Sequence, residues 1–327
     1  MSNEIFDSVI EYLTLDLKNP LSKLPNYLKD NIEEIRLRVN TPLCIYSEGK
    51  DHFVSKEGRI ANSFSEAIIV NAEQINKTFQ LVSNYSIYAL KEELKNGFIT
   101  VKGGHRIGIG GKVIYGDTGI EGIKNVSSLN FRIAREKLGI SDKFIKYLIR
   151  NNNFCNTLII SPPQCGKTTL LRDMIRNLSN GMKKPYVNGY KVGLVDERSE
   201  IAGVFNGMPQ KDVGIRTDVL DSCNKPQGII MLIRSMSPNI IAVDEIGSAD
   251  DIKAIEEALR AGIKLIATVH GYSISDIKDR KSLRDLFQEK VFERYLILDN
   301  SKGVGTVREI IDANSMKNIL REEEAIW

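Results

Sequence analysis

Residues 161–169 decide the fold of this chain, and they read Ser161-Pro162-Pro163-Gln164-Cys165-Gly166-Lys167-Thr168-Thr169. The apolar run 157–160 precedes them, and residues 170–178 follow them with apolar side chains at helical spacing. This order predicts a strand, a loop and a helix. In such a loop the backbone N–H groups and the positive end of the helix bind a phosphate chain. We expect all nine residues to bind nucleotide, with Lys167 on the terminal phosphates and Thr168 on magnesium.

The loop departs at one position from the pattern G-x-x-x-x-G-K-[ST], because Ser161 stands where the first glycine is expected. Serine is unstrained there if its backbone is extended, as at the end of a strand, and it is strained if φ is positive. The alternative is an ordinary strand, turn and helix with a chance Gly-Lys-Thr. The agreement of all three segments with the motif favours phosphate binding.

The composition is that of an ordinary globular protein with room for two domains, at 327 residues, 42% hydrophobic and 27% charged. The 45 basic and 42 acidic residues leave a net charge of +3, which gives no bulk signal for nucleic-acid binding. The four cysteines form no C-x-x-C pair, so neither zinc nor a disulfide framework is indicated. The N-terminus is acidic, and no apolar run approaches the roughly 18 residues of a membrane span. We therefore expect a cytoplasmic protein.

Four further apolar runs in the C-terminal half predict strands, and helical patterns lie between them; the runs are 192–195, 240–243, 265–268 and 295–298. This alternation is typical of an α/β fold with a largely parallel, buried sheet. Two of the helices have clear ends. One spans about Gln227–Met236 and stops before Pro238, and the other spans Ala249–Ala261 and is closed by Gly262.

Two carboxylates, Asp244 and Glu245, directly follow the apolar run 240–243, which is a Walker B arrangement. We expect Asp244 to bind magnesium through water, and Glu245 to orient and deprotonate the water that attacks the γ-phosphate. Such a strand could instead end in two solvated acids. The phosphate loop upstream in the same chain favours the Walker B interpretation.

Two other strand ends carry candidate groups, and ligands of open α/β sheets bind at these ends. Glu197 follows the run 192–195 and is the second candidate for water activation, whereas its neighbours Arg198 or Glu200 alternatively form a structural ion pair. His270 follows the run 265–268 and could bind the γ-phosphate by a hydrogen bond. A core histidine with satisfied hydrogen bonds is the alternative for it.

Alternating apolar and charged residues in Ile32–Val39, followed by Leu43–Tyr46, predict a half-buried hairpin in the N-terminal half. Arg36 and Arg38 fall on one face of it, which indicates either a phosphate-facing pair or a solvated face. Glycines cluster inside the strand-like segment Phe98–Tyr115. This clustering predicts a bulge or a close approach to the backbone.

Two helices are expected within Asn71–Asn96, meeting near Ser83 and stopped by Gly97. We place the domain boundary near Gly139. A new helix is expected to begin with Ser141 as its N-cap and to run to about Arg150.

With these residues in order, the chain resembles the stage III sporulation protein AA family, relatives of the secretion and pilus-motor ATPases. The resemblance spans most of the chain and departs from the family pattern at Ser161 and Gln164. It rests on these motifs: Glu34-Ile-Arg-Leu-Arg38, Gly104-His-Arg-Ile-Gly108, Arg132-Ile-Ala-Arg-Glu136, Pro162-Pro-Gln-Cys-Gly-Lys-Thr-Thr-Leu-Leu-Arg-Asp173, Asp196-Glu-Arg-Ser-Glu-Ile-Ala-Gly203, Arg216-Thr-Asp-Val-Leu-Asp221, Met231-Leu-Ile-Arg-Ser-Met-Ser-Pro238 and Asp244-Glu-Ile-Gly247.

The resemblance implies a RecA-like P-loop ATPase core, residues 140–327, behind a smaller N-terminal α/β domain and linker, residues 1–139. It also implies assembly into a ring, expected to be a hexamer, with nucleotide between the two domains. Arg132 and Arg135 match the linker arginines that reach the phosphates in the wider superfamily. Arg106 is a further candidate for the same role.

The implied function is magnesium-dependent ATP hydrolysis that drives the cytoplasmic motor of a sporulation-associated, secretion-like membrane channel. The expected partners are ATP, further copies of the chain and membrane-embedded sporulation channel proteins, at the cytoplasmic face on the mother-cell side; no DNA is expected. A nucleic-acid motor is a second hypothesis, against which the near-neutral charge and the lack of an aromatic-basic stripe argue. A non-hydrolysing, nucleotide-dependent scaffold is a third, which the Ser161 departure keeps open.

Overall fold

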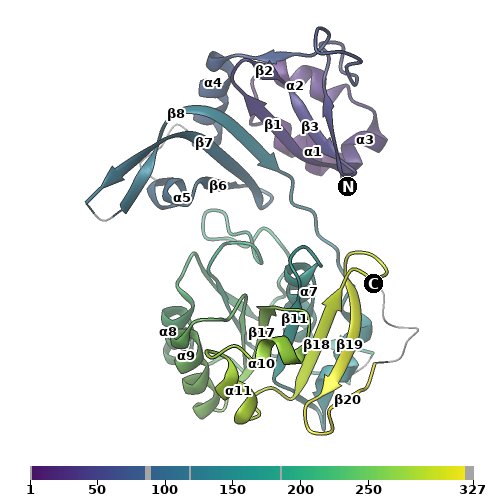
Figure 1. The fold of residues 1–327 in the computed structure, drawn as a ribbon, viewed down its shortest axis with the longest axis vertical. Coiled ribbons are helices and arrows are strands. Elements are labelled where there is room, and N and C mark those ends of the chain that lie inside the picture. The colour runs from purple at the N-terminus through teal and green to yellow at the C-terminus, as the bar shows by residue number, and fades with distance from the viewer. Residues whose placement is uncertain (1, 85–89, 118, 185, 321–327) are drawn as a thin grey trace. The chain divides into compact units, whose positions relative to one another are not determined.

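The structure is a computed structural model that describes residues 2–84, 90–117, 119–184 and 186–320 (Figure 1). The chain folds into two compact units: unit 1 is Met1–Arg135 with Phe205–Gln210, and unit 2 is Glu136–Val204 with Lys211–Trp327. Each unit has its own sheet and its own hydrophobic core. The expected boundary near Gly139 falls within the first residues of unit 2. In the described part of the chain, every helix is too short or too polar to cross a membrane.

Unit 1 is built on a six-stranded antiparallel sheet with the order β4-β3-β1-β8-β7-β6 (Figure 1). Its strands are β1 (Ile32–Arg38), β3 (Cys44–Ser47), β4 (Lys50–Phe53), β6 (Phe98–Val101), β7 (His105–Gly116) and β8 (Gly119–Arg132). The predicted hairpin is confirmed, because β1 pairs antiparallel with β3. Arg36 Nε donates to Glu34 Oε2 at 2.6 Å, so Arg36 has an ion-pair partner on this face, whereas Arg38 is exposed.

Helices and two short strands complete unit 1: α1 (Ser2–Ile10), α2 (Leu15–Ser22), α3 (Asn26–Asn31), β2 (Thr41–Pro42), β5 (Ile69–Val70), α4 (Ala72–Val82) and α5 (Lys91–Lys95). Their apolar side chains and one face of the sheet form a core that includes the fully buried Phe6, Ile35, Leu37 and Phe131. Burial of this apolar surface is the main favourable contribution to the stability of the unit.

The two helices expected within residues 71–96 are present. Asn71 caps α4 through a reciprocal pair of hydrogen bonds with Gln74, and α4 ends one residue before Ser83, near the expected junction. Residues 85–89 lie outside the described residues. Gly97 follows α5 with a φ of 79°, as expected for a left-handed residue that ends a helix.

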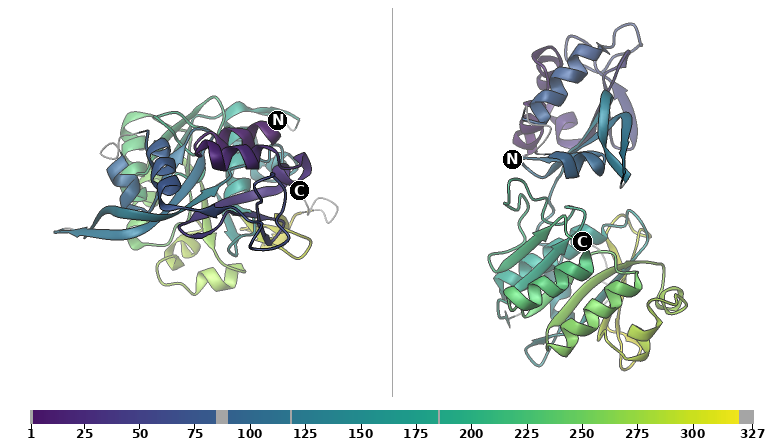
Figure 2. Two further views of the ribbon diagram at one scale, coloured as in Figure 1. Left: turned by 90° about the horizontal axis from the view of Figure 1, so that it is seen from above. Right: turned by 90° about the vertical axis from the view of Figure 1, so that its left-hand side faces the viewer.

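The glycines of β7 accommodate the close approach of β8 in a long hairpin (Figures 1 and 2). The pairing register shifts between Gly110 and Lys112, so the expected bulge is present. A Cβ atom on Gly111 would lie 2.8 Å from the carbonyl oxygen of Lys124. Any larger residue would therefore push the two strands apart at this point.

Unit 2 is built on an eight-stranded sheet with the order β15-β14-β16-β17-β11-β18-β19-β20. Its strands are β11 (Thr157–Ser161), β14 (Val192–Asp196), β15 (Thr217–Asp221), β16 (Ile240–Val243), β17 (Lys264–His270), β18 (Arg294–Asp299), β19 (Thr306–Asp312) and β20 (Lys317–Asn318). The first six in this order are parallel, and β19 pairs antiparallel with both β18 and β20. All five strands expected around and after the phosphate loop are confirmed.

Helices cover both faces of this sheet (Figure 2). They are α6 (Asp142–Ile145), α7 (Lys167–Asn180), α8 (Lys225–Ser235), α9 (Ala249–Arg260), α10 (Ile274–Lys278) and α11 (Arg284–Gln288). Alternate residues of β16 belong to different cores: Ile240 packs in the core that includes α7, and Ile241 packs in the core that includes α8 and α9. A strand buried on both faces explains the continuous apolar runs of the sequence.

The expected helix from Ser141 to Arg150 is wrong in its second half. The α-helix α6 ends at Ile145, a 3-10 turn covers Lys146–Leu148, and β9 (Ile149–Arg150) then pairs with β10 (Asn153–Phe154). Asn151 and Asn152 connect the two strands with φ values of 51° and 61°. Asparagine tolerates this left-handed conformation, so the chain turns back instead of continuing the helix.

Candidate functional site

Ser161 is the last residue of β11, where its backbone is extended and pairs with His270 of β17. Its carbonyl oxygen accepts a hydrogen bond from the N–H of Gly271 at 3.1 Å. Serine has no conformational cost in this extended position. The substitution of the first motif glycine is thus compatible with the backbone that the structure shows.

The loop between β11 and α7 turns through two residues with positive φ, Gln164 at 61° and Gly166 at 84°. Gly166 is the N-cap of the 14-residue helix α7 and has no side chain that could satisfy its first N–H groups. These groups point out of the helix and carry a partial positive charge. The loop therefore presents a surface suited to phosphate. Cys165 is buried within the loop, and burial raises the pKa of its thiol.

Strand β17 lies between β11 and β16, so one strand separates the loop 161–169 from the carboxylates of Asp244 and Glu245. Thr168 Oγ1 donates to Asp244 Oδ2 at 3.3 Å, and the hydroxyl of Thr268 on β17 donates to the other oxygen of Asp244. A hydroxyl and a carboxylate oxygen are ligands that magnesium prefers. Thr168 and Asp244 are close enough to serve the same ion, so the donor set fits the expected metal.

Lys167 lies among acidic groups at these strand ends, and its side chain is only 6% exposed. Its Nζ atom is 3.0 Å from Glu245 Oε1, 3.7 Å from Asp244 Oδ1 and 3.4 Å from His270 Nε2. A buried ammonium group of this kind requires anionic partners. The two carboxylates supply them.

Glu245 is bonded to three positively charged or hydrogen-donating side chains. Besides Lys167, His270 Nε2 lies 2.8 Å from Glu245 Oε1 and Arg198 Nη1 lies 3.2 Å from Oε2. Burial opposes ionisation of Glu245, but the hydrogen bonds and charges of Lys167 and His270 outweigh it and lower the pKa of this carboxyl. Nδ1 of His270 is buried and has no hydrogen-bond partner among the described residues.

Glu197, the second candidate base, has a different partner. Its carboxylate forms an ion pair with the ammonium of Lys225, the first residue of α8. Glu197 and Glu245 nevertheless line the same crevice at the carboxyl edge of the sheet, together with Arg198 and Lys225. The structure thus brings both candidate bases to one crevice but gives each its own cation.

Two further side chains hold this edge of the sheet in place, and neither role was expected from the sequence. Asp196 is buried and accepts hydrogen bonds from the backbone N–H groups of Glu200, Ile201 and Ala202 at 2.8–3.0 Å. Burial raises the pKa of Asp196 to about 6. Arg172 of α7 donates from Nε and Nη2 to the carbonyls of Ile201 and Glu200. A carboxylate at the end of a buried strand was the available signal for Asp196, whereas nothing in the local pattern indicated Arg172.

The candidate arginines of the N-terminal half all belong to unit 1. Arg135 donates from Nη1 to the Ile32 carbonyl at 2.5 Å and from Nη2 to the Lys29 carbonyl at 3.0 Å. The side chain of Arg132 is 64% exposed, and its Nε lies 3.9 Å from Glu34 Oε1. Arg106 stacks over the ring of Phe98 at 3.7 Å. A role of these arginines toward nucleotide stays a prediction.

Solved structures of ATPases share the fold of this chain. The X-ray structure of the ATPase DotB of Legionella pneumophila aligns with a TM-score of 0.53 at 15% identity, covering 81% of this chain and 71% of DotB. The pilus retraction motor PilT with bound ADP aligns with a TM-score of 0.52 at 16% identity, covering 81% and 73%. The predicted α/β fold with a RecA-like core, the fold of these ATPases, is confirmed.

Sequence comparison identifies the family. The family model for sporulation stage III, protein AA, matches residues 7–318. Stage III sporulation protein AA of Bacillus subtilis (strain 168) is 46% identical over 306 residues, which cover 94% of this chain and 95% of that protein. A protein of Cyanidium caldarium named ycf45 is 32% identical over 161 residues, 49% of this chain and 45% of its own length. The family model matches nearly the whole chain, and the Bacillus subtilis protein is 46% identical over 94% of it. The chain therefore belongs to the stage III sporulation protein AA family.

Proposed function

We propose that this chain hydrolyses ATP to ADP and phosphate in a magnesium-dependent reaction. The observation that carries the proposal is the meeting of Lys167, Asp244 and Glu245 within 3.0–3.7 Å at the carboxyl ends of strands β11 and β16. An ammonium group, a metal-binding carboxylate and a base at one sheet edge, next to a phosphate-binding loop, are the parts that phosphoryl transfer to water requires.

Each residue has a defined part in the proposed reaction. The backbone N–H groups of residues 164–169 and the ammonium of Lys167 bind the phosphates. Magnesium, held by Thr168 and through water by Asp244, would neutralise charge on the phosphate oxygens. Glu245 accepts a proton from the attacking water while the water oxygen bonds to the γ-phosphorus and the bond to the ADP oxygen breaks.

Lys167 must exchange partners in this reaction. It is bonded to Glu245 and lies near Asp244, whereas the motif directs it to the β- and γ-phosphates. A phosphate chain carries more negative charge than Glu245, so it competes effectively for the ammonium. The exchange removes the main hydrogen bond that lowers the pKa of Glu245. Nucleotide binding thereby makes Glu245 a stronger base at the moment when one is needed.

At the level of the cell, we propose that the chain is the cytoplasmic motor of a sporulation-associated, secretion-like membrane channel on the mother-cell side. Membership of the sporulation family supports the setting, and the fold shared with DotB and the pilus retraction motor PilT supports the motor. A hexameric ring with Arg132 and Arg135 reaching nucleotide belongs to the same proposal. The membrane-embedded partners are the channel proteins of that complex.

The test is ATP turnover by the purified chain with magnesium and with EDTA, alongside light scattering to measure the oligomer. We expect magnesium-dependent release of phosphate, no stimulation by DNA and a ring of defined size. A chain that binds ATP but releases no phosphate under any of these conditions would support a scaffold instead. Stimulation by DNA would support a nucleic-acid motor.

A further inference from the structure

Two glutamates line the crevice at the carboxyl edge of the unit 2 sheet, and either could accept the proton of the attacking water. Their cations differ. Glu245 is bonded to Lys167, a residue of the phosphate loop, and to Arg198, whose side chain is 66% exposed, whereas Glu197 is bonded to the buried Lys225 at the start of α8. Bound phosphate attracts Lys167 away from Glu245. Lys225 is not a residue of the phosphate loop, so phosphate does not attract it away from Glu197 in this way. The two candidate bases therefore differ in whether phosphate binding removes a cation from them.

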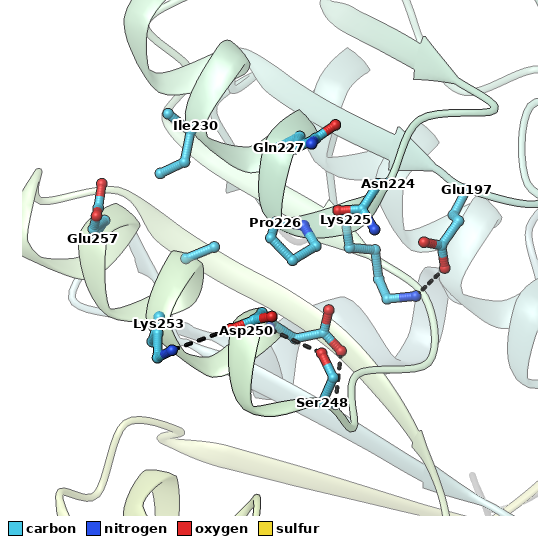
Figure 3. Close-up of a pocket in the computed structure, with 12 residues that line it drawn as sticks. Glu197, Asn224, Lys225, Pro226, Gln227, Ile230, Ser248, Asp250, Lys253 and Glu257 are labelled. Carbon is cyan, nitrogen blue, oxygen red and sulfur yellow. Dashed lines mark hydrogen bonds and ion pairs between the residues drawn. The ribbon is translucent and has the colours of Figure 1, made fainter. Parts of the chain in front are cut away.

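The position of Lys225 is unfavourable for a cation unless Glu197 is present. It is the first residue of α8, where the helix dipole presents positive charge, and the first turn of α8 contains no acidic residue. Only 8% of Lys225 is exposed, so water compensates little of its charge. In the described part of the chain, Glu197 is the one carboxylate bonded to this ammonium (Figure 3). The buried Lys225 thus needs Glu197, whose own side chain is 35% exposed.

We propose that Lys225 is a positioning residue that holds Glu197 in a permanent ion pair and so leaves Glu245 as the proton acceptor of the reaction. This inference rests on the proposed ATPase function. A proton on Glu197 would leave the ammonium of Lys225, of which only 8% is exposed, without its carboxylate partner. Lys225 acts through Glu197 and does not itself touch the reacting atoms.

The surroundings of Lys225 make it suitable for substitution. Besides the crevice, Lys225 and Glu197 line a cavity of about 680 Å³ between α8 and α9 (Figure 3). Pro226, Ile230 and Ala254 contribute apolar surface to the same cavity. A shorter or uncharged side chain at position 225 therefore opens onto existing space and creates no new void in a packed core.

The decisive experiment uses the Glu245→Gln background, in which the main base is removed. We expect Lys225→Met in that background to raise kcat about tenfold above Glu245→Gln alone, because the released Glu197 supplies part of the 10²- to 10⁴-fold effect of a positioned base. Lys225→Arg is the matched control and should leave kcat at the Glu245→Gln level, since it keeps the cation. Adding Glu197→Gln to the Lys225→Met, Glu245→Gln protein should remove the gain. ATP affinity should stay the same throughout.

A second readout needs no ATP. The free energy of unfolding, measured with denaturant and without nucleotide, should show non-additivity in a cycle of Lys225→Met and Glu197→Gln, with the double variant less destabilised than the sum of the singles. Lys225→Gln replaces Lys225→Met in both tests if the latter does not fold. Additive effects, or no gain in kcat from either neutral substitution, would overturn the inference. An inactive wild type would instead refute the proposed function.

Discussion

Lys167 Nζ and Glu245 Oε1 lie 3.0 Å apart, so the loop lysine and the candidate base form an ion pair. The pair joins two sequence motifs whose residues Lys167 and Glu245 are 78 positions apart in the chain. In the proposed reaction one cation would serve two partners in turn, Glu245 and then phosphate. Nucleotide binding and activation of the base would then be coupled through a single ammonium group.

Lys167→Ala is expected to abolish nucleotide binding, because Lys167 is the side-chain cation that the loop motif directs to the phosphates. The measurement is the affinity for a fluorescent ATP analogue. Lys253→Ala is the matched control, since Lys253 lies on α9 with a side chain that is 75% exposed. Equal affinity of the Lys167→Ala variant and the wild type would refute the phosphate-loop interpretation.

Glu245→Gln is expected to keep ATP and magnesium bound but to lower kcat by about 10²- to 10⁴-fold, the usual contribution of a general base. The amide keeps the size of the side chain and, through its single oxygen, the hydrogen bond from Lys167, but its NH₂ group cannot accept from Arg198 and it accepts no proton. Steady-state turnover and ATP binding separate the two effects. Glu256→Gln on the surface of α9 is the control. If kcat were near the wild-type value in Glu245→Gln and low in Glu197→Gln, Glu197 would be the base instead of Glu245.

Asp196 is expected to make stability depend on pH in a direction opposite to that of most carboxylates. Burial raises its pKa in the folded chain to about 6 from the ordinary value of 3.8. The folded state therefore holds this proton more tightly than the unfolded state, and the contribution is fully present below pH 3.8 and is lost as pH rises through 6. The difference between the two pKa values of Asp196 corresponds to about 3 kcal/mol in the free energy of unfolding.

The measurement is the free energy of unfolding from pH 4 to 7, compared with Asp196→Asn. We expect the wild type to lose stability relative to this variant as pH rises. The pKa of Glu245 is lowered, so its contribution has the opposite sign and is common to both proteins. A constant difference between wild type and Asp196→Asn would show that Asp196 does not titrate in this range.

The fold of unit 2 was predictable because its strands are buried on both faces and its longer helices have clear ends. The run 240–243 coincides with β16, and Ala249 begins α9 as expected. Strands β15 and β19 were not predicted, since they are partly exposed and polar side chains interrupt them. Helices α1 to α3 were also missed. They are short, and proline occurs inside α2 and at the N-cap of α3, where local patterns are weak.

Residues of the candidate site could be predicted from the sequence only where they lie at or after the end of a predicted strand. Thr168, Asp244, Glu245 and His270 each follow or end a strand that the sequence pattern indicates, and the parallel sheet brings them together. The partner of Glu197 was not predictable. Lys225 starts a helix 28 residues further along the chain, and only the packing of α8 brings its ammonium to Glu197. Long-range ion pairs of this kind leave no periodic signal.

Arg132 and Arg135 are expected to differ in their effect on stability. Arg135→Ala removes two charge-assisted hydrogen bonds to the carbonyls of Ile32 and Lys29, and it should lower the free energy of unfolding by about 1–3 kcal/mol. Arg132→Ala removes one exposed ion pair at 3.9 Å, which is worth at most about 1 kcal/mol. Denaturant unfolding of the two variants measures both values.

Arg132 is therefore the cleaner test of the ring mechanism. If it stabilises transition-state charge on nucleotide, Arg132→Ala should lower kcat more than ATP affinity, and wild-type activity per subunit should rise with protein concentration as rings assemble. Arg38→Ala is the control, since Arg38 is another exposed arginine of unit 1. Turnover that is independent of concentration, together with a fully active Arg132→Ala variant, would mean that each subunit hydrolyses ATP with the groups of unit 2 alone. In that case Lys167, which already reaches both the phosphate loop and Glu245, would supply the positive charge that the arginine was expected to provide.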